Sequence, residues 1–417
     1  MRRRTTELPC LARRGVLVAN SMIFIGASLI AVLLLIGCSN RDDVAEIEGL
    51  QTWRDIDLPE PPEEPLASEL RLLIWRDYFD PEVLELFEDH YGVELKVTFF
   101  ENNSDLKRRY RADPEGFDLL MPSSYVVERL VKADLVAELN KERLPNMGNV
   151  APAFFQAEYD RELRFSVPFF FSYLGVAFNS DYLRSLPRDF KLTSSSREEN
   201  LILYSYRSLL DENRITIATQ LLQNGFDQNS TDPEQIRVVI DKLIEQSAEN
   251  GIRFLADDLP SALIENEILI AACWSGAANY ALAENPAIRF VLPDGPKFLE
   301  IDSLVILKSS PHQATAEFLM NYLLIPAISG ANTNYSYYAN SNEASRPFVQ
   351  RDILIGPSYM SAPAGTSIFL QDLGDFENFY EQEWTRMKSL LQPVPPKIPL
   401  RTSPRASVQE DDFGRKN

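Results

Sequence analysis

The sequence predicts an α/β fold divided into two lobes, and three observations support this prediction. The chain has 417 residues, which is long for one ordinary domain and sufficient for two. Hydrophobic residues make up 45% of it and charged residues 24%, a composition typical of a globular protein with a sizeable core. Short apolar segments alternate with helix-like segments, and this alternation is typical of α/β layers with mostly parallel sheets.

The first segment of the chain predicts export. Arginines at both ends of residues 2–14 precede an apolar run over 16–36, which leads into Gly37 and Cys38. A basic segment followed by an apolar one is the pattern of a secretion signal, and its ending resembles the lipobox of bacterial lipoproteins. We therefore expect residues 1–37 to be a lipoprotein signal peptide and Cys38 to be lipidated, which places the chain in the periplasm or at the cell surface, anchored to the membrane. The alternative is an uncleaved anchor, because the run is long enough to span a bilayer.

Charge and cysteine content exclude some classes of protein. The net charge is −20, which argues against a nucleic-acid partner because phosphate binding depends on Lys and Arg. Of three cysteines, cleavage removes Cys10 and lipidation uses Cys38, so Cys273 has no partner for a disulfide. Residues 38–69 are acidic and rich in proline, which predicts a linker, and residues 396–417 predict a polar tail.

The first ordered segments predict a βαβ unit. A short apolar strand, RLLIW, ends at Trp75. Asp80 then supplies a helix N-cap, Pro81 the first helical residue and Gly92 the end of the helix. The apolar residues of the next strand alternate on one side: Val93, Leu95, Val97 and Phe99. Strand, helix and strand in this order form a βαβ unit.

The alternation continues along the chain. We expect helices over 104–111, 126–136, 233–250, 275–285, 313–324 and 376–392, and strands over 117–121, 164–179, 267–274 and 299–307. The strand 164–179 is one strand or two, broken near Pro168. A capping box formed by Thr231 and Glu234 is expected to start the helix that Gly251 ends, and the polar residues 192–200 are expected to begin a second βα region.

Side chains suited to binding a cation recur where these strands end. The tetrapeptide WRDY (75–78) follows the first strand and SSY (123–125) follows another, while Glu212 and Trp274 stand at two further ends and Asp302 precedes an apolar run. Ligands of α/β sheets bind beyond the carboxyl ends of the strands. Aromatic faces attract cations, and a buried carboxylate needs a partner. Each residue alone is more typical of a core aromatic or a helix cap, so the prediction of a site for an elongated organic cation depends on their recurrence.

The sequence does not favour an enzyme. His90 and His312 have no His or Cys neighbours at metal-ligand spacing. G-x-S-x-G, G-x-x-x-x-G-K-[ST] and H-E-x-x-H motifs do not occur. We therefore predict no catalytic residues, no metal and no cofactor.

From Leu70 to Gln392 the chain resembles the putrescine and spermidine solute-binding proteins of bacterial ABC transporters. The resemblance is carried by an ordered set of segments: IWRDYFDP, FDLLMPSSYVVERL, LLDENRI, NSTDPEQI, ENEILIAACWSGAANYA, IDSLVI and MNYLLIPAISGANTNYSYYANSNEASRPFV. It implies a hinged, two-lobed periplasmic-binding-protein fold of type II, with a mostly parallel sheet flanked by helices in each lobe. Lobe 1 would comprise 70–177 and 303–342, and lobe 2 would comprise 178–302 and 343–395. The implied function is capture of a polyamine between the lobes and its delivery to an ABC permease and its ATPase.

The same resemblance implies the aromatic residues of a ligand site. Trp75 and Tyr78 match residues that line the ligand slot, and Trp274 matches one that covers the alkyl chain. Tyr338, or with less support Tyr335, matches a ring beside the cleft.

It also implies the polar residues of that site. Asp302 matches a carboxylate that anchors an ammonium group, and Asp77 matches a carboxylate near one amine. Ser123 and Tyr125 match polar contacts from the second loop.

Four departures from the pattern affect the expected ligand. Ile215 and Ala277 replace acidic residues, Glu300 replaces an aromatic residue, and Arg76 replaces a small hydroxyl residue. Glu212 or Glu300 could supply the missing charge. Two rivals to polyamine transport stay open: the same fold with another cationic or zwitterionic solute or a sensory output, and a surface lipoprotein that binds no solute.

Overall fold

The computed structural model describes residues 53–156, 158–186, 206–360 and 365–391. One compact unit begins at Leu58. In the unit before it, the described residues form a single 3-10 turn, η3 (Trp53–Asp55). The predicted signal peptide, Cys38, residues 192–200 and the tail lie outside the described residues. In the part of the chain that is described, no helix has the length and apolar character needed to cross a membrane.

The second half of the predicted linker packs on the folded unit. Glu64 forms an ion pair of 2.6 Å with Arg143, and the amide of Ala67 donates a hydrogen bond of 2.8 Å to Thr315 Oγ1. Residues from Leu58 onward are therefore part of the folded unit, and the expected spacer is shorter than 38–69.

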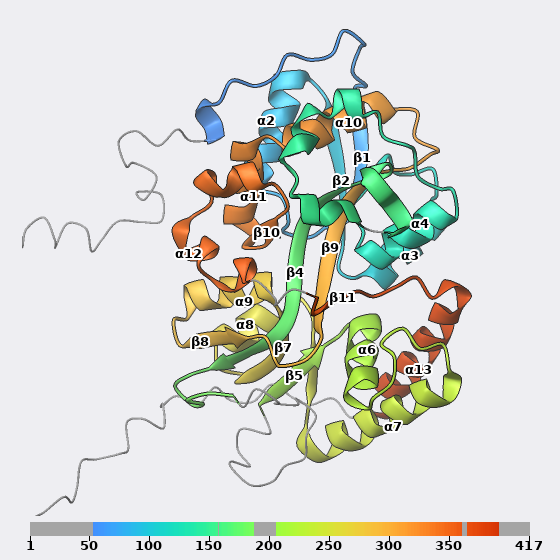
Figure 1. Ribbon diagram of the computed structural model, residues 1–417, viewed down its shortest axis with the longest axis vertical. Helices are drawn as coiled ribbons and strands as arrows, with labels where there is room; N and C mark the ends of the chain where they lie inside the picture. Colours follow the sequence, from blue (N-terminus) through green and yellow to red (C-terminus); the bar gives the residue numbers. More distant parts are fainter. Residues whose placement is uncertain (1–52, 157, 187–205, 361–364, 392–417) are drawn as a thin grey trace, which may run out of the picture. The chain divides into compact units, whose positions relative to one another are not determined.

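Among the residues that the structure describes, eleven strands form the sheet of this unit (Figure 1). Its main path runs through β2 (Glu94–Phe100), β1 (Glu69–Trp75), β3 (Leu119–Leu120), β9 (Lys297–Ile306), β4 (Ser166–Asn179), β7 (Ile270–Trp274), β5 (Arg207–Leu210) and β6 (Arg253–Leu255). Two short strands pair with β4, namely β8 (Ile288–Val291) and β10 (Ala339–Asn340), and β11 (Ser367–Ile368) pairs with β9.

The sheet is mixed, with parallel strands in its outer parts and antiparallel pairs at its centre. β1 is parallel to β2 and β3, and β5 is parallel to β6 and β7. By contrast, β4 is antiparallel to β9 and to β7, and β9 is also antiparallel to β3. Parallel neighbours need a helical crossover, and helices stand between β1, β2 and β3 and between β5, β6 and β7 along the chain. β4 pairs with β9 over 166–173 and with β7 over 174–178, so one strand joins both halves of the sheet.

The helices occupy most of the expected segments. They are α2 (Pro81–Tyr91), α3 (Asn103–Ala112), α4 (Ser124–Lys132), α6 (Asn213–Gln223), α7 (Pro233–Asn250), α8 (Leu259–Ile264), α9 (Ser275–Glu284), α10 (Gln313–Leu323), α11 (Pro326–Ser336), α12 (Arg351–Leu354) and α13 (Glu377–Leu390). The predicted ends of α2 are confirmed: the Asp80 side chain accepts a hydrogen bond from the amide of Glu82, and Gly92 ends the helix with φ of 68°.

Three local expectations change in the structure. Asp232, and not Thr231, caps α7, because Pro233 takes the first helical position and leaves the cap to the residue before it. β4 passes through Pro168 as a single strand with a shift of register. Phe99 is 40% exposed while Phe100 is fully buried, since Phe100 packs against Trp75 with ring centroids 4.4 Å apart.

Candidate functional site

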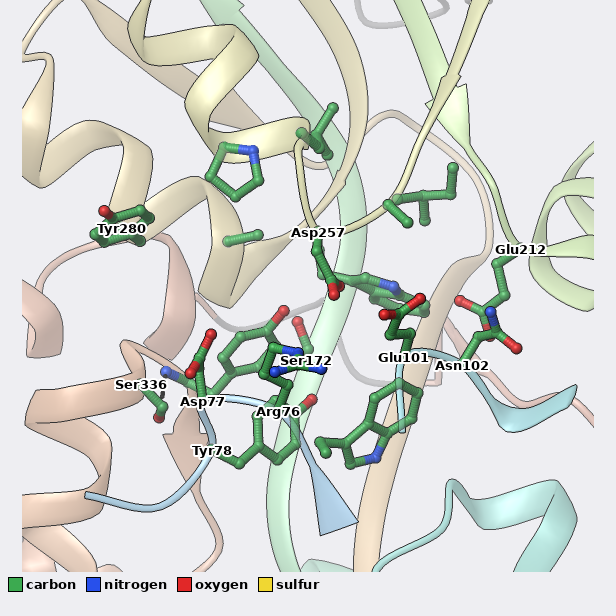
Figure 2. A pocket seen from close by; sticks show the side chains of 18 of the residues that line it. Arg76, Asp77, Tyr78, Glu101, Asn102, Ser172, Glu212, Asp257, Tyr280 and Ser336 are labelled. Atoms are coloured by element: carbon green, nitrogen blue, oxygen red, sulfur yellow. Dashed lines mark hydrogen bonds between the residues drawn. The ribbon is translucent and has the colours of Figure 1, made fainter. Parts of the chain in front are cut away.

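A pocket with a volume of ≈ 550 Å³ lies at the ends of strands β1, β2, β5, β6 and β7 and beside β9 (Figure 2). Nine of the ten predicted site residues line it: Trp75, Asp77, Tyr78, Ser123, Glu212, Trp274, Glu300, Asp302 and Tyr338. Tyr335, the less favoured alternative to Tyr338, also lines it. The strand-end pattern of the sequence therefore corresponds to one cavity.

Aromatic rings form part of the pocket wall. The ring of Tyr78 lies 5.8 Å from that of Trp75 and 4.9 Å from that of Tyr338, measured between centroids. Phe100, which also lines the pocket, packs against Trp75 with ring centroids 4.4 Å apart. These rings offer faces against which an alkyl chain or a cation can pack.

Gly276, in the first turn of α9, makes room for one of these rings. A Cβ atom at this position would lie 2.4 Å from Cγ of Tyr338. A residue without a side chain is therefore needed where α9 passes the Tyr338 ring.

Asp302 lies on β9 and receives two hydrogen bonds from other elements. Ser123 Oγ donates to Oδ1 at 2.7 Å, and the Tyr78 hydroxyl donates to Oδ2 at 2.9 Å. Burial raises the pKa of Asp302 to about 6, although Ser123, Tyr78 and Trp75 act in the opposite direction. The Trp75 indole nitrogen is buried and has no hydrogen-bond partner of its own among the described residues.

Glu300 stands two residues earlier on the same strand. Its Oε1 accepts hydrogen bonds from Ser124 Oγ at 2.7 Å and from the Ser124 amide at 3.1 Å. Burial, and then the charges of Asp302 and Glu212, raise the pKa of Glu300 to about 8.

Glu212 reaches the pocket from the other half of the sheet, where it follows β5 and forms the N-cap position of α6. Burial, followed by the charge of Asp302, raises the pKa of Glu212 to about 7, while Asn103, Lys107 and Trp274 lower it. Asn103 also donates a hydrogen bond of 2.9 Å to Ser123 Oγ, so polar contacts link Glu212 to the Asp302 group.

We call Glu212, Glu300 and Asp302 the inner carboxylates. None of them forms an ion pair within the described part of the chain. Buried carboxylates without a cation are unfavourable. Burial raises the pKa of all three groups, and the charge of Asp302 raises those of Glu212 and Glu300 further. The pocket therefore favours protons or an external cation beside these groups.

A second group of charges lies at the exposed rim of the pocket. Its carboxylates are Asp77, Glu101 and Asp257, which we call the rim carboxylates, and the exposed Arg76 stands among them (Figure 2). The guanidinium carbon of Arg76 lies 5.5 Å from the centroid of the Phe99 ring. Burial and the charge of Glu101 raise the pKa of Asp257, and Arg76 lowers it.

Glu101 and Asp257 were not predicted from the sequence. Glu101 directly follows β2, and Asp257 stands two residues after β6. The rule that identified the other site residues, a carboxylate after a strand, would therefore have included both.

Tyr125 is the predicted site residue that does not line the pocket. It lies in the first turn of α4, where it is buried. Its ring stands 5.9 Å from Lys107 Nζ and 6.0 Å from the guanidinium carbon of Arg214. Lys107 is itself paired with Glu377 at 2.7 Å, so Tyr125 belongs to the packing between α3, α4 and α13.

The side chains of the pocket are suited to binding an organic ligand and not to holding a metal ion. Among the described residues, no cluster of three or more His, Cys, Asp or Glu side chains could hold a metal ion. What the pocket offers is aromatic surface, hydroxyl groups and negative charge.

Comparison with known proteins gives a consistent result. The model of the family described as bacterial extracellular solute-binding protein matches residues 82–356. The chain is 26% identical over 322 residues to the spermidine/putrescine-binding periplasmic protein 1 of Haemophilus influenzae, covering 76% of this chain and 88% of that protein. It is 26% identical over 344 residues to the putrescine-binding periplasmic protein PotF of Escherichia coli, covering 78% and 93%.

Solved structures agree in fold. The spermidine/putrescine ABC transporter substrate-binding protein PotD of Streptococcus pneumoniae matches with a TM-score of 0.63 at 23% identity, over 78% of this chain and 99% of that one. The Tp0655 (TpPotD) lipoprotein of Treponema pallidum matches with a TM-score of 0.66 at 19% identity, over 76% and 99%. The expected α/β periplasmic-binding-protein fold is confirmed.

Proposed function

The chain belongs to the bacterial extracellular solute-binding proteins, and we propose that it captures a polyamine, such as putrescine or spermidine, in the pocket described above. Its relatives bind solutes and are not enzymes. The chain would deliver its ligand to the permease and ATPase of an ABC transporter while lipidated Cys38 keeps it at the membrane.

The inner carboxylates carry this proposal. Three acidic groups from two halves of the sheet, of which Glu300 and Asp302 are buried and Glu212 is half-buried, meet in a cavity with aromatic walls, and none is paired with Lys or Arg in the described chain. An organic cation would supply the missing charge, and its methylene groups would pack on Trp75, Tyr78, Trp274 and Tyr338.

Capture would proceed by closure of two lobes around the ligand. We take lobe 1 as 70–177 plus 303–342 and lobe 2 as 178–302 plus 343–395. The boundaries of both lobes fall on the long strands β4 and β9 or close to β10. By these bounds Trp75 and Tyr78 belong to lobe 1 and the inner carboxylates belong to lobe 2, so a ligand that contacts both groups favours the closed state.

A specific observation favours a second candidate, the same fold with a different cationic or zwitterionic solute or a sensory output. Ala277 lines the pocket without a charge and Ile215 is buried in α6. At these two positions the resemblance predicts acidic residues.

Isothermal titration of the purified full-length protein in detergent tests the proposal. Putrescine, spermidine, agmatine, arginine and lysine would be titrated in turn. We expect saturable binding of at least one polyamine and a rise in the free energy of unfolding of about 2.7 kcal/mol at a hundredfold excess over Kd. Binding of a different solute alone would favour the second candidate. An unchanged melting temperature with every solute would favour a lipoprotein that binds none.

A further inference from the structure

The charges of the pocket differ in their burial. Among the inner carboxylates, Glu300 and Asp302 are buried, with 7% and 4% of the residue exposed, and Glu212 is half-buried. The rim carboxylates are exposed. A ligand that enters with one charged end first therefore meets two successive groups of carboxylates, one at depth and one at the mouth.

Arg76 is the one Lys or Arg side chain among the described residues that line this pocket. It lies at the rim, and its charge lowers the pKa of Asp257. Asp211, another lining carboxylate, is already paired with Lys388 at 2.8 Å. Arg76 therefore interacts with the rim carboxylates at the mouth of the pocket and does not neutralise the inner carboxylates.

One role for Arg76 would be to bind a carboxylate of the ligand. Three rim carboxylates surround the single guanidinium, so the mouth has an excess of negative charge and repels an anionic group. Without Arg76 the three rim carboxylates would form a second site for a cation at the mouth, and Arg76 weakens this site by offsetting part of their charge.

We propose that Arg76 limits the length of the cation that the pocket accepts, favouring a short diamine over a longer triamine. This inference rests on the proposed function. Both ammonium groups of a short diamine can interact with the inner carboxylates, which come from both halves of the sheet. A triamine has a further ammonium group, and this group lies toward the mouth, where the guanidinium occupies space among the rim carboxylates and offsets part of the negative charge that would otherwise bind it.

The test is a comparison of Kd for putrescine and spermidine in four proteins: the unmodified chain, Arg76→Gln, Arg76→Lys and Arg76→Glu. We expect the unmodified chain and Arg76→Lys to bind putrescine more tightly than spermidine. Arg76→Gln should raise the affinity for spermidine about tenfold and change that for putrescine by less than about threefold. Arg76→Glu should raise the affinity for spermidine further.

A matched control separates the local effect from net charge. Arg237→Gln makes the same change of charge on α7 at a residue that does not line the pocket, and it should leave the ratio of the two Kd values unchanged. High salt should reduce the effect of Arg76→Gln because exposed charges are screened.

The possible failures are distinct. If the unmodified chain binds a polyamine but Arg76→Gln leaves the ratio unchanged, the role of Arg76 is wrong and the proposed function stands. If Arg76→Lys changes the ratio as much as Arg76→Gln, packing of Arg76 on Phe99 is the cause and the charge-based proposal is wrong. If neither polyamine binds to any of the four proteins, the proposed function and this inference both fail.

Discussion

Ser123 Oγ donates a hydrogen bond of 2.7 Å to Asp302 Oδ1, joining residues 179 positions apart in the chain. The two residues also form an isolated antiparallel bridge between the segment after β3 and strand β9. Both side chains are buried. The bond therefore holds the Asp302 carboxylate in place without neutralising it, so its charge is available to a ligand.

Replacing this charge should weaken cation binding. Asp302→Asn keeps the size of the side chain and an oxygen that can accept from Ser123, but removes the negative charge. We expect the affinity for the best polyamine to fall by at least about tenfold, or about 1.4 kcal/mol, in calorimetric titration. Asp375→Asn is the matched control, because its side chain is 98% exposed and lies outside the pocket lining. Equal affinities for the two variants would show that Asp302 does not contact the ligand.

Cation affinity should rise with pH. The pKa values of Asp302, Glu212 and Glu300 are raised to about 6, about 7 and about 8, so the empty pocket binds protons that a cation must displace. Affinity should therefore increase between about pH 5.5 and 8.5, and binding near neutral pH should release protons.

Titrations at several pH values, in buffers that differ in ionisation enthalpy, measure both effects. An affinity that stays constant across this range, with no proton release, would show that the inner carboxylates are not the groups that bind the cation.

Enlarging Gly276 should displace the Tyr338 ring. The added Cβ of Gly276→Ala would lie 2.4 Å from Tyr338 Cγ, and this ring packs against Tyr78 at 4.9 Å. We expect the free energy of unfolding to fall by about 1–3 kcal/mol and polyamine affinity to fall with it.

Thermal and calorimetric measurements on Gly276→Ala and on Gly148→Ala test this prediction. A Cβ at Gly148 would meet no atom within 4 Å, so Gly148→Ala should behave like the unmodified protein. Equal losses in both variants would point to helix and turn propensity as the cause.

Much of the site could be predicted from the sequence because its residues follow strands. In a sheet the ends of neighbouring strands converge, so Trp75, Ser123, Glu212 and Trp274 meet although they are far apart in the chain. Tyr125 does not line the pocket because α4 begins at Ser124. One residue into a helix, the direction of a side chain depends on helix geometry and no longer on the strand.

Non-local pairing explains what the sequence did not predict. The 14 residues of β4 are apolar almost throughout, so hydrophobic pattern does not indicate that the strand changes partners after Tyr173. For the same reason, the meeting of Glu101 with Asp257 depends on the order of strands in the sheet, which no local motif encodes.

Glu300→Gln should have opposite effects on stability and on binding. Folding raises the pKa of Glu300 from 4.5 to about 8. Below about pH 4.5 the side chain is protonated in both states, and its ionisation has no effect on stability. As pH rises toward 8, the unfolded chain loses this proton first, so the unmodified protein becomes less stable. Glutamine cannot ionise and still offers an oxygen to Ser124.

The free energy of unfolding of the variant should therefore exceed that of the unmodified protein at pH 8 by on the order of 1 kcal/mol or more, with little difference near pH 4. Its polyamine affinity should fall at pH 8, because one inner carboxylate is lost. Denaturant titrations at pH 4, 6 and 8, with the exposed Glu115→Gln as control, measure the first effect, and calorimetry measures the second. A variant less stable than the unmodified protein at pH 8 would mean that Glu300 is compensated in the empty pocket, and the need of the inner carboxylates for an external cation would then be contradicted.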